Sequence, residues 1–519
     1  MATKIETFRN MYQDSVSLMQ ISAQISKLPG VEQASVVMGT PTNLTQLRDA
    51  GLGDIIEAGP NDLVIAVRGE SSACEEALRL AAERLNSRAD TPTNQASEDA
   101  APVSLAMACE RAPDANLALI SVPGDYAAAE AIKALELGMN VMLFSDNVGL
   151  QDEKRIKTLA REKRLIVMGP DCGTAIVNGM PLGFANVVRR GAIGVVGASG
   201  TGLQEVTCRI EQLGAGVSQA LGTGGHDLHE EIGGISMQFG LDALAEDPAT
   251  EVIVLISKPP ARAVAERILE RARRAGKPVV VNFLGAPEGD MRGPGLTPAL
   301  TLADAAQFAV ALLNKTPLPA SVARVDARDE AILVRHAQAL GAPRRFIRGV
   351  FAGGTFCYES QLLCQREGLT ASSNTPVAGN SKLDDIWQSV GHTIVDLGDD
   401  DFTRGRPHPM IDPTLRDERI RDELRDSETA VVLFDLVLGY GAAEAPAQGL
   451  IDILERARAE APGGDAPVLI AHVCGTQGDP QIRSRQIDAL KAAGVLVAGC
   501  NAEAALWASR VARLQADKE

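Results

Sequence analysis

The chain has 519 residues, too many for one hydrophobic core, so several domains of ordinary size are expected. Its 49 glycines, 45% hydrophobic content and 3% aromatic content are typical of parallel sheets covered by helices. The formal net charge of -17 argues against nucleic acid and anionic membranes as partners, because both require clustered Lys and Arg. No segment is long and apolar enough to span a bilayer, and the sequence therefore predicts a cytoplasmic protein.

Residues 1–88 are predicted to form a small α+β domain. Strands are expected over 5–11, 31–38 and 62–67, and helices over 15–27, 42–50 and 72–85. The next stretch, 89–102, is polar, contains proline and has no apolar periodicity. These features indicate an interdomain linker.

Three α/β domains are predicted after the linker, over 103–188, 189–325 and 326–519. The first reads β-α-β-α-β, with strands at 117–122, 141–144 and 165–168. The other strands are expected at 194–196, 216–219, 252–256, 278–282, 429–434, 468–471 and 495–497. Helical crossovers predict parallel pairing, so the fold class is multidomain α/β, with Rossmann-like and flavodoxin-like sheets.

Four glycine-rich turns follow apolar strands and precede predicted helices. They lie at 195–202, 350–356, 436–442 and 472–478. Small residues let the backbone approach an anion closely, and a helix N-terminus favours negative charge there. One such turn indicates little, because any strand-to-helix connection uses glycine, but four together favour at least one phosphate site. The chain contains neither a Walker A loop nor a G-x-G-x-x-G fingerprint with the acidic residue that should follow it.

The loop over 402–413 is dense in groups that bind or move charge. Arg404 and Arg406 have the fork geometry that suits a carboxylate or phosphate, and His408 is expected to titrate near neutrality. The alternative is a rigid surface connection, because the loop is also rich in proline.

His226 and His229 have an i, i+3 spacing that suggests a metal site. Neighbouring acidic residues favour a structural role instead, so no metal is predicted and His226 is expected to contact substrate or phosphate. The eight cysteines form no CxxC pair and are expected to be free thiols. Cys172 and Cys357 lack charged neighbours in sequence that would lower their pKa, so each is expected at most to line a site.

Residues 117–184 resemble the second half of the CoA-binding domain in the α chain of succinyl-CoA synthetase. The resemblance rests on Pro123 after a strand and on the Gly-Pro-Asp-Cys run that ends at Cys172, and it implies that both residues line a substrate site. The turn at 194–201 resembles the α-chain turn whose helix points at a phosphohistidine. It implies phosphate contacts from Ser199, Gly200 and Thr201.

Residues 392–510 resemble the C-terminal domain of the β chain of the same enzyme. The resemblance places Gly439 and Gly441 at the start of an opposing helix that faces the phosphate, and it places residues 474–477 at a Gly-Thr turn. The two halves of the synthetase would then face each other within one chain.

Across nearly its full length the chain resembles the FdrA family. The motifs are residues 12–15, 37–40, 351–357 and 405–413, and within the third Gly354 and Thr355 are expected to contact substrate. The resemblance implies a subunit of an oxamate carbamoyltransferase of allantoin-type purine catabolism, in which phosphate cleaves oxalurate to oxamate and carbamoyl phosphate. Other protein subunits are the implied partners. No phosphohistidine is required, no cofactor is assigned, and CoA binding is left open.

The departures from the synthetase pattern concern its phosphoryl relay. The segment 277–295 contains no histidine, and the glutamate that would orient one is replaced by Ser257-Lys-Pro-Pro260. No ATP-grasp domain precedes the β-like half, which argues against ATP-driven thioester synthesis by this chain alone. In the carbamoyltransferase reading, Arg404 or Arg406 takes the substrate carboxylate, and His226 or His408 moves a proton. The alternatives are a subunit of an ADP-forming acyl-CoA synthetase and a non-catalytic, metabolite-binding scaffold.

Overall fold

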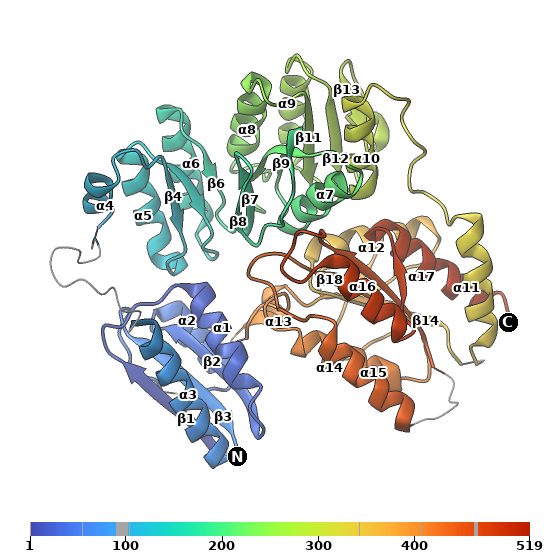
Figure 1. The fold of residues 1–519 in the computed structure, drawn as a ribbon, viewed down its shortest axis with the longest axis horizontal. Helices are drawn as coiled ribbons and strands as arrows, with labels where there is room; N and C mark the ends of the chain where they lie inside the picture. The colour runs from blue at the N-terminus through green and yellow to red at the C-terminus, as the bar shows by residue number, and fades with distance from the viewer. Residues whose placement is uncertain are drawn as a thin grey trace. The chain divides into compact units, whose positions relative to one another are not determined.

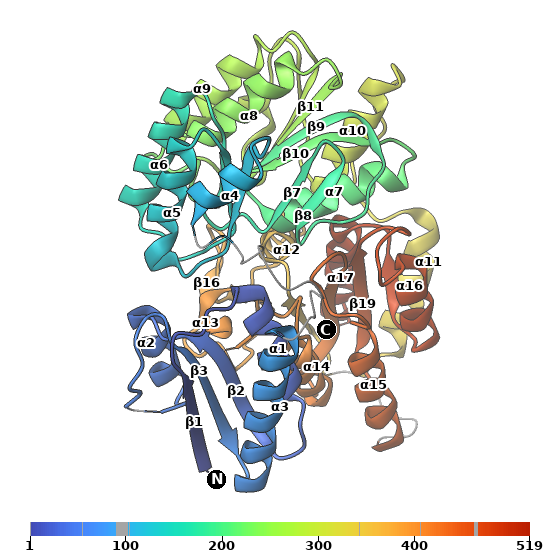
Figure 2. The same ribbon diagram turned by 60° about the vertical axis from the view of Figure 1, so that its left-hand side comes forward.

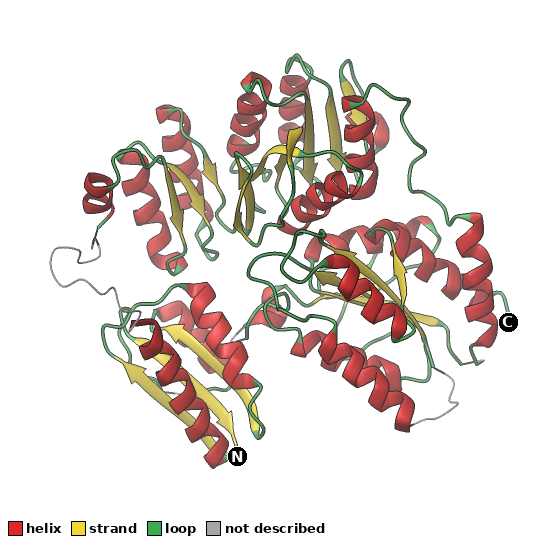
Figure 3. Cartoon of the chain, viewed as in Figure 1, coloured by secondary structure: helices red, strands yellow, loops and turns green. Residues whose placement is uncertain are grey.

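The computed structural model describes residues 2–53, 55–89, 102, 104–341, 343–404, 406–460 and 466–518. By its contacts the chain divides into two compact units. The first comprises 1–172 with 402–412, and the second comprises 173–401 with 413–519. The predicted fold class is confirmed: Figure 3 shows sheets flanked by helices throughout the described chain. The predicted linker lies almost entirely outside the described residues.

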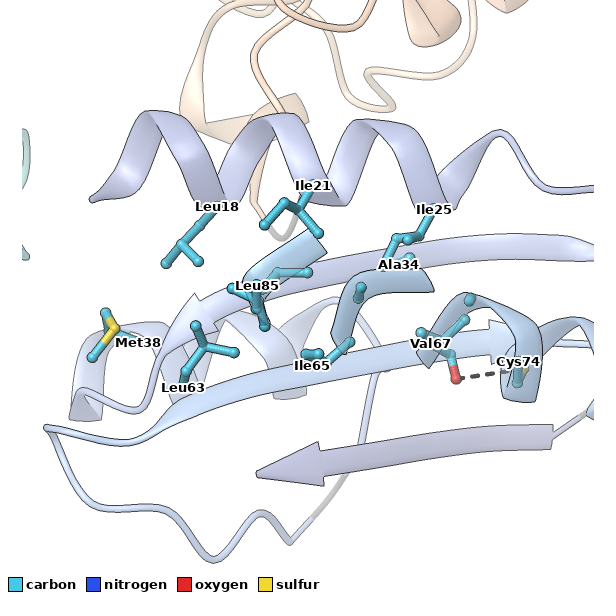
Figure 4. Packing of buried hydrophobic residues seen from close by; sticks show 13 residues of the cluster. Leu18, Ile21, Ile25, Ala34, Met38, Leu63, Ile65, Val67, Cys74 and Leu85 are labelled. Carbon is cyan, nitrogen blue, oxygen red and sulfur yellow. Dashed lines mark hydrogen bonds between the residues drawn. The ribbon is translucent and has the colours of Figure 1, made fainter. Parts of the chain in front are cut away.

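The N-terminal domain has a three-stranded antiparallel sheet in the order β1-β3-β2. Its elements are β1 (Ala2–Phe8), α1 (Ser15–Ser26), β2 (Val31–Met38), α2 (Pro41–Asp49), β3 (Leu63–Gly69) and α3 (Ser71–Ala89). Figure 4 shows Ile21 and Ile25 of α1 on the face of the sheet that also carries Ile65 and Val67 of β3, in one hydrophobic cluster. The alternate β3 residues pack against Leu47 of α2. Strand β3 is apolar from Leu63 to Val67 because both its faces are covered there.

The second sheet of the first unit is parallel, in the order β4-β5-β6. Its elements are α4 (Leu105–Arg111), β4 (Leu117–Ile120), α5 (Gly124–Glu136), β5 (Asn140–Leu143), α6 (Leu150–Lys163) and β6 (Val167–Met168). Pro123 is the N-cap of α5, and Cys172 is buried shortly after β6. Both residues therefore lie just beyond carboxyl ends of parallel strands, where ligands of such sheets bind.

The second unit contains two seven-stranded sheets, the first in the order β13-β12-β11-β9-β10-β7-β8. Its strands are β7 (Thr174–Val177), β8 (Met180–Gly183), β9 (Arg190–Gly197), β10 (Val217–Gly222), β11 (Val252–Ser257), β12 (Val279–Phe283) and β13 (Leu296–Pro298). Its helices are α7 (Gly200–Gln212), α8 (Ile235–Glu246), α9 (Arg262–Ala272), α10 (Leu302–Leu313) and the 3-10 helix η1 (Glu288–Met291). Helices α7 and α10 pack together, as do α8 and α9.

Residues 174–183, predicted to be part of the Rossmann-like domain over 103–188, instead form two strands of the first seven-stranded sheet. Strands β7 and β8 form an antiparallel hairpin, and β7 pairs antiparallel with β10. The turn is Asn178-Gly179, with φ of 52° and 80°. An Asn-Gly pair in this left-handed conformation matches the strand twist and closes a two-residue hairpin. The prediction that helical crossovers join all the strands is therefore wrong for β7 and β8, which this turn connects directly.

The second sheet of this unit is parallel throughout, in the order β16-β15-β17-β14-β18-β19-β20. Its strands are β14 (Phe346–Phe351), β15 (Ser372–Ser373), β16 (Ser381–Lys382), β17 (Thr393–Asp396), β18 (Thr429–Val437), β19 (Val468–Cys474) and β20 (Leu496–Ala498). Its helices are α11 (Ala327–Ala339), α12 (Gly354–Arg366), α14 (Thr414–Arg425), α15 (Gln448–Glu460), α16 (Arg483–Ala492) and α17 (Asn501–Ala516). Short helix α13 (Asp400–Thr403) spans the junction of the two units.

Helix layers join the two sheets of the second unit. Helix α12 contacts α7, and α17 contacts α10. Both Figures 1 and 2 draw α7 and α12 in the region where these sheets meet. Among the described helices, none combines the length and apolar character needed to cross a membrane.

Candidate anion site

Helices α7 and α12 begin immediately after glycine-rich turns, and their first residues meet. Ser199 is the N-cap of α7, and its Oγ accepts a hydrogen bond from the Gly202 N–H at 3.0 Å. The same hydroxyl lies 2.5 Å from Thr355 Oγ1 in the first turn of α12. Two helix N-termini from different sheets therefore converge on one pair of hydroxyl groups.

Several backbone donors at this meeting point are available to a ligand. Within the described chain, no hydrogen bond is formed by the N–H groups of Gly200, Thr201, Gly354 or Thr355. Each helix also carries a partial positive charge at its N-terminus. Free amides, hydroxyl groups and two helix dipoles together make a site suited to a phosphate or another oxyanion.

The close approach of the two turns depends on glycine and on a buried carboxylate. A Cβ atom at Gly353 would lie 3.1 Å from Thr201 Cγ2. The carboxylate of Asp435 accepts hydrogen bonds from the N–H groups of Ala352 and Gly353, both at 2.7 Å. Burial raises the pKa of Asp435. This residue holds the turn before α12 in place and leaves the next amides free.

Lys258 contributes a positive charge that the sequence analysis recorded only as part of a departure from the synthetase pattern. It follows β11, which pairs with β9, so it lies at the same sheet edge as Ser199. Its Nζ lies 5.6 Å from the centre of the Tyr358 ring on α12. Its charge also acts on Asp396, at the end of β17. A cation from the first sheet therefore reaches the start of α12.

Asp396 is the acidic group of the site. Its Oδ1 accepts a hydrogen bond from the Gly398 N–H at 2.9 Å, and no hydrogen bond within the described chain reaches Oδ2, which lies against Gly354. Burial raises the pKa of this carboxyl to about 7, although the charge of Lys258 acts in the opposite direction. Asp396 was missed in the sequence analysis, although an aspartate at the carboxyl end of an apolar strand is a usable signal.

Gly439 and Gly441 do not begin a helix that faces the phosphate. The connection after β18 runs on to Gln448, where α15 starts. The Gly439 N–H donates to Gln481 Oε1 at 3.1 Å, and a Cβ atom at Gly439 would lie 2.9 Å from the Ala185 carbonyl oxygen. The structure corrects this prediction: the helix that opposes α7 is α12.

The loop after β19 has a similar structural role. Helix α16 does not begin until Arg483. The Asp479 carboxylate accepts hydrogen bonds at 2.7 Å from the N–H groups of Thr476 and Val187, and at 2.8 Å from Asn186 Nδ2. Asp479 therefore occupies the Thr476 N–H within the loop and, by accepting from Val187 and Asn186, joins the loop to the β8–β9 connection.

His226 lies in the connection between β10 and α8, at the carboxyl edge of the first sheet of the second unit. Its ring is exposed, and its centroid is 5.0 Å from that of His229. Among the described residues, neither histidine belongs to a group of three or more side chains that could hold a metal ion.

The first unit contains the loop with Arg404, Arg406 and His408. Arg404 is exposed and Arg406 half-buried, and an ion pair of 3.7 Å between Lys27 and Asp412 connects the loop to the N-terminal domain. The backbone N–H of Met410 donates to His408 Nδ1 at 3.2 Å. Burial lowers the pKa of His408 to about 4, so the expectation that it titrates near neutrality is wrong.

Comparison with known families places these features in context. The CoA-ligase family model matches residues 350–511, and the CoA binding domain model matches residues 188–285. The model of the AllF heavy metal-associated domain matches residues 1–102. Fold and site together define a protein built on a succinyl-CoA synthetase α-like scaffold, with an AllF-type N-terminal domain.

The chain belongs to the family of the uncharacterized protein YahF of Escherichia coli (strain K12), with 44% identity over 98% of each chain. It is also 34% identical to succinate–CoA ligase [ADP-forming] subunit alpha-2 of Trichomonas vaginalis, over 35% of this chain and 60% of that one. Among solved structures it matches PH0766 from Pyrococcus horikoshii OT3 at 15% identity with a TM-score of 0.31, over 78% of this chain and 84% of that one.

The metal suggested by the name of the N-terminal family does not fit this domain. Between residues 1 and 102 there is no histidine, and Cys74 is the sole cysteine. Its buried thiol lies within hydrogen-bonding reach of the carbonyl oxygens of Ala2 and Val67. Soft metals require several thiolate or imidazole ligands, so no step of the function is derived from a metal here.

Proposed function

We propose that this chain is an FdrA-type subunit of an oxamate carbamoyltransferase. The observation that carries the proposal is the contact of Ser199 and Thr355 between two helix N-termini, with Lys258 beside them. The matching loop of the synthetase would place a phosphohistidine near such a site, but residues 277–295 contain none. Inorganic phosphate itself is therefore the reactant that we assign to the site.

In the proposed reaction a phosphate oxygen attacks the carbamoyl carbon of oxalurate. A C–O bond forms and the C–N bond to the oxamate nitrogen breaks, with its electron pair going to that nitrogen. Asp396, about half protonated at neutral pH because burial raises its pKa to about 7, donates the proton that makes oxamate a neutral amide. The more acidic phosphate of the product then returns a proton to Asp396, which closes the cycle.

The remaining residues bind and orient the reactants. The free amides of Gly200, Thr201 and Gly354 hold the phosphate, and Lys258 balances its charge. Arg404 or Arg406 takes the oxalurate carboxylate, and His226 remains a proposed substrate contact. Other subunits of the complex are proposed partners, and the cytoplasm is the proposed compartment.

The test is formation of carbamoyl phosphate from oxalurate and phosphate by this chain co-purified with the products of its neighbouring genes. ATP and CoA are each omitted in turn. Product without either compound is expected. Strict dependence on CoA and a nucleotide would refute the carbamoyltransferase assignment. In the active complex, Arg406→Ala is expected to raise KM for oxalurate, with the fold checked by circular dichroism.

A second candidate is a subunit of an ADP-forming acyl-CoA synthetase. The match of residues 188–285 to the CoA binding domain favours it. At Gly200, a Cβ atom would meet only Thr174 Oγ1, at 4.0 Å, so the start of α7 is open enough for a phosphate group of CoA. Bound CoA would supply the thiol that accepts the acyl group. Tight CoA binding, together with CoA-dependent activity in the complex, would favour this candidate.

A further inference from the structure

Four buried side chains with metal-binding atoms lie close together between α7 and β19 of the second unit. Glu205 and Cys208 come from α7, and His472 and Cys474 come from β19. Residues three apart on a helix share one face, and residues two apart on a strand do the same. The exposed fractions of the four side chains are 3%, 0%, 1% and 0% in that order. The cluster is therefore enclosed by protein.

The ligand atoms lie close to one another. His472 Nε2 is 2.7 Å from Glu205 Oε2. Glu205, His472 and Cys474 each offer one ligand atom within 4.8 Å of the other two. The Cys208 thiol lies outside that group of three but forms a side-chain hydrogen bond with the Cys474 thiol.

The orientation of the His472 ring decides which of its nitrogens can bind an ion. His472 Nδ1 is buried and has no hydrogen-bond partner among the described residues. The nitrogen that faces the other ligand atoms is Nε2, which lies 2.7 Å from Glu205 Oε2. The edge of the Phe356 ring packs against the imidazole, with 5.5 Å between the two ring centroids. The ring is thus held in place with one nitrogen unsatisfied.

We propose that Glu205, His472 and Cys474, with Cys208 as the fourth ligand, bind a zinc ion. Zinc takes sulfur, nitrogen and oxygen ligands in tetrahedral geometry, with neighbouring ligand atoms roughly 3.3 Å apart for bonds of about 2.0 Å. The carboxylate and imidazole need to part only slightly to reach that separation. Two thiolates and one carboxylate leave a single net negative charge around the ion. The positive charges of Arg209 and Arg483, which act on Glu205, offset it.

The position of the site assigns it a structural task. Four protein ligands in a buried setting leave no open coordination position, which is the mark of structural zinc. The ion joins α7 of one sheet to β19 of the other, a short distance along α7 from the Ser199 N-cap. It therefore fixes the relative position of the two anion-binding helices. This inference stands whether or not the proposed carbamoyl transfer is correct.

The test uses the full chain, purified without chelators and analysed by inductively coupled plasma mass spectrometry. About one equivalent of zinc per chain is expected, and cobalt substitution should produce thiolate-to-cobalt absorption in the near ultraviolet. Cys474→Ser and His472→Gln are each expected to weaken zinc binding at least tenfold. Cys364→Ser removes a buried thiol of α12 outside the cluster and should leave the zinc content unchanged.

Glu205→Gln provides a further variant that keeps a hydrogen-bonding group toward His472, in case the other two fail to fold. Its zinc affinity is also expected to fall at least tenfold while its circular dichroism spectrum stays unchanged. The proposal is overturned if the folded wild-type chain neither contains nor binds zinc. It is equally overturned if Glu205→Gln retains full zinc affinity, or if non-reducing mass spectrometry finds Cys208 and Cys474 joined as a disulfide in the native chain.

Discussion

Two pairs of glycine-rich segments look alike in sequence: the turns before α7 and α12, and the loops after β18 and β19. They differ in whether their backbone N–H groups already donate hydrogen bonds within the protein. At the first pair, a helix begins directly, and the amides of Gly200 and Gly354 have no acceptor among the described residues. At the second pair, Gln481 and Asp479 occupy the donors. A glycine-rich turn is thus an anion site only where no neighbouring side chain has already satisfied it.

The largest effect is expected from Asp396→Asn, which removes the proposed proton donor from the first pair. Loss of a general acid should lower kcat by roughly 10²- to 10⁴-fold. Phosphate binding, followed by ³¹P NMR titration, should be retained because the amides and Lys258 are untouched. Unchanged kcat in an active complex would exclude Asp396 as the donor, without affecting the carbamoyltransferase assignment.

Asp479→Ala probes the second pair. It leaves buried donors of Thr476, Val187 and Asn186 without an acceptor, so the free energy of unfolding should fall by about 3–5 kcal/mol. Denaturant titration measures the loss. Asp488→Ala, at an exposed position on α16, is the matched control and should change little. An equally stable Asp479→Ala chain would show that this loop is not held together as described.

Gly200→Asp places a carboxylate at the open start of α7. We expect phosphate affinity to fall about 100-fold, because the new charge occupies the helix N-terminus and repels the anion. Gly200→Ala is the control, since its Cβ atom meets only Thr174 Oγ1 at 4.0 Å. Phosphate affinity that is equal in the two variants would contradict an anion site at α7.

Gly439→Ala should affect stability and leave phosphate binding intact. Gly439 has φ of 124°, and the added Cβ atom would press on the Ala185 carbonyl oxygen. Strain of this kind costs about 1–3 kcal/mol. A thermal melt measures the loss, and weaker phosphate binding in a folded variant would restore the phosphate role that the sequence suggested.

The dependence of stability on pH should also reveal Asp396. Its folded-state pKa of about 7 lies above the ordinary 3.8, so the folded chain holds a proton that the unfolded chain has released. The contribution of this group to stability is therefore favourable at low pH and is lost as pH rises from about 4 to about 7, by up to about 1.4 kcal/mol per pH unit. Asp396→Asn should reduce that slope. Glu359, whose pKa is also raised to about 7, supplies a second slope of the same sign.

Local sequence patterns are sufficient to predict the class of fold and the N-cap that begins α7. Apolar strands separated by helices predict parallel sheets, and Ser199 after a glycine turn marks a helix N-cap, because both signals depend on neighbouring residues in the chain. The Asn178-Gly179 pair is an equally local pattern, and it predicts the hairpin of β7 and β8.

Which helix faces α7, and which glycine turns keep unoccupied donors, depends on contacts between residues that are far apart in the chain. In sequence, Thr355 is 156 residues from Ser199, which it contacts. Asp479 is 292 residues from Val187, whose N–H donates a hydrogen bond to the Asp479 carboxylate. The local sequence does not indicate whether a distant carboxylate accepts hydrogen bonds from the N–H groups of a turn. The raised pKa of Asp396 likewise comes mainly from burial, which depends on how the whole sheet packs. Such pairings arise from packing between elements that are far apart in sequence, so no periodicity or spacing could have predicted them.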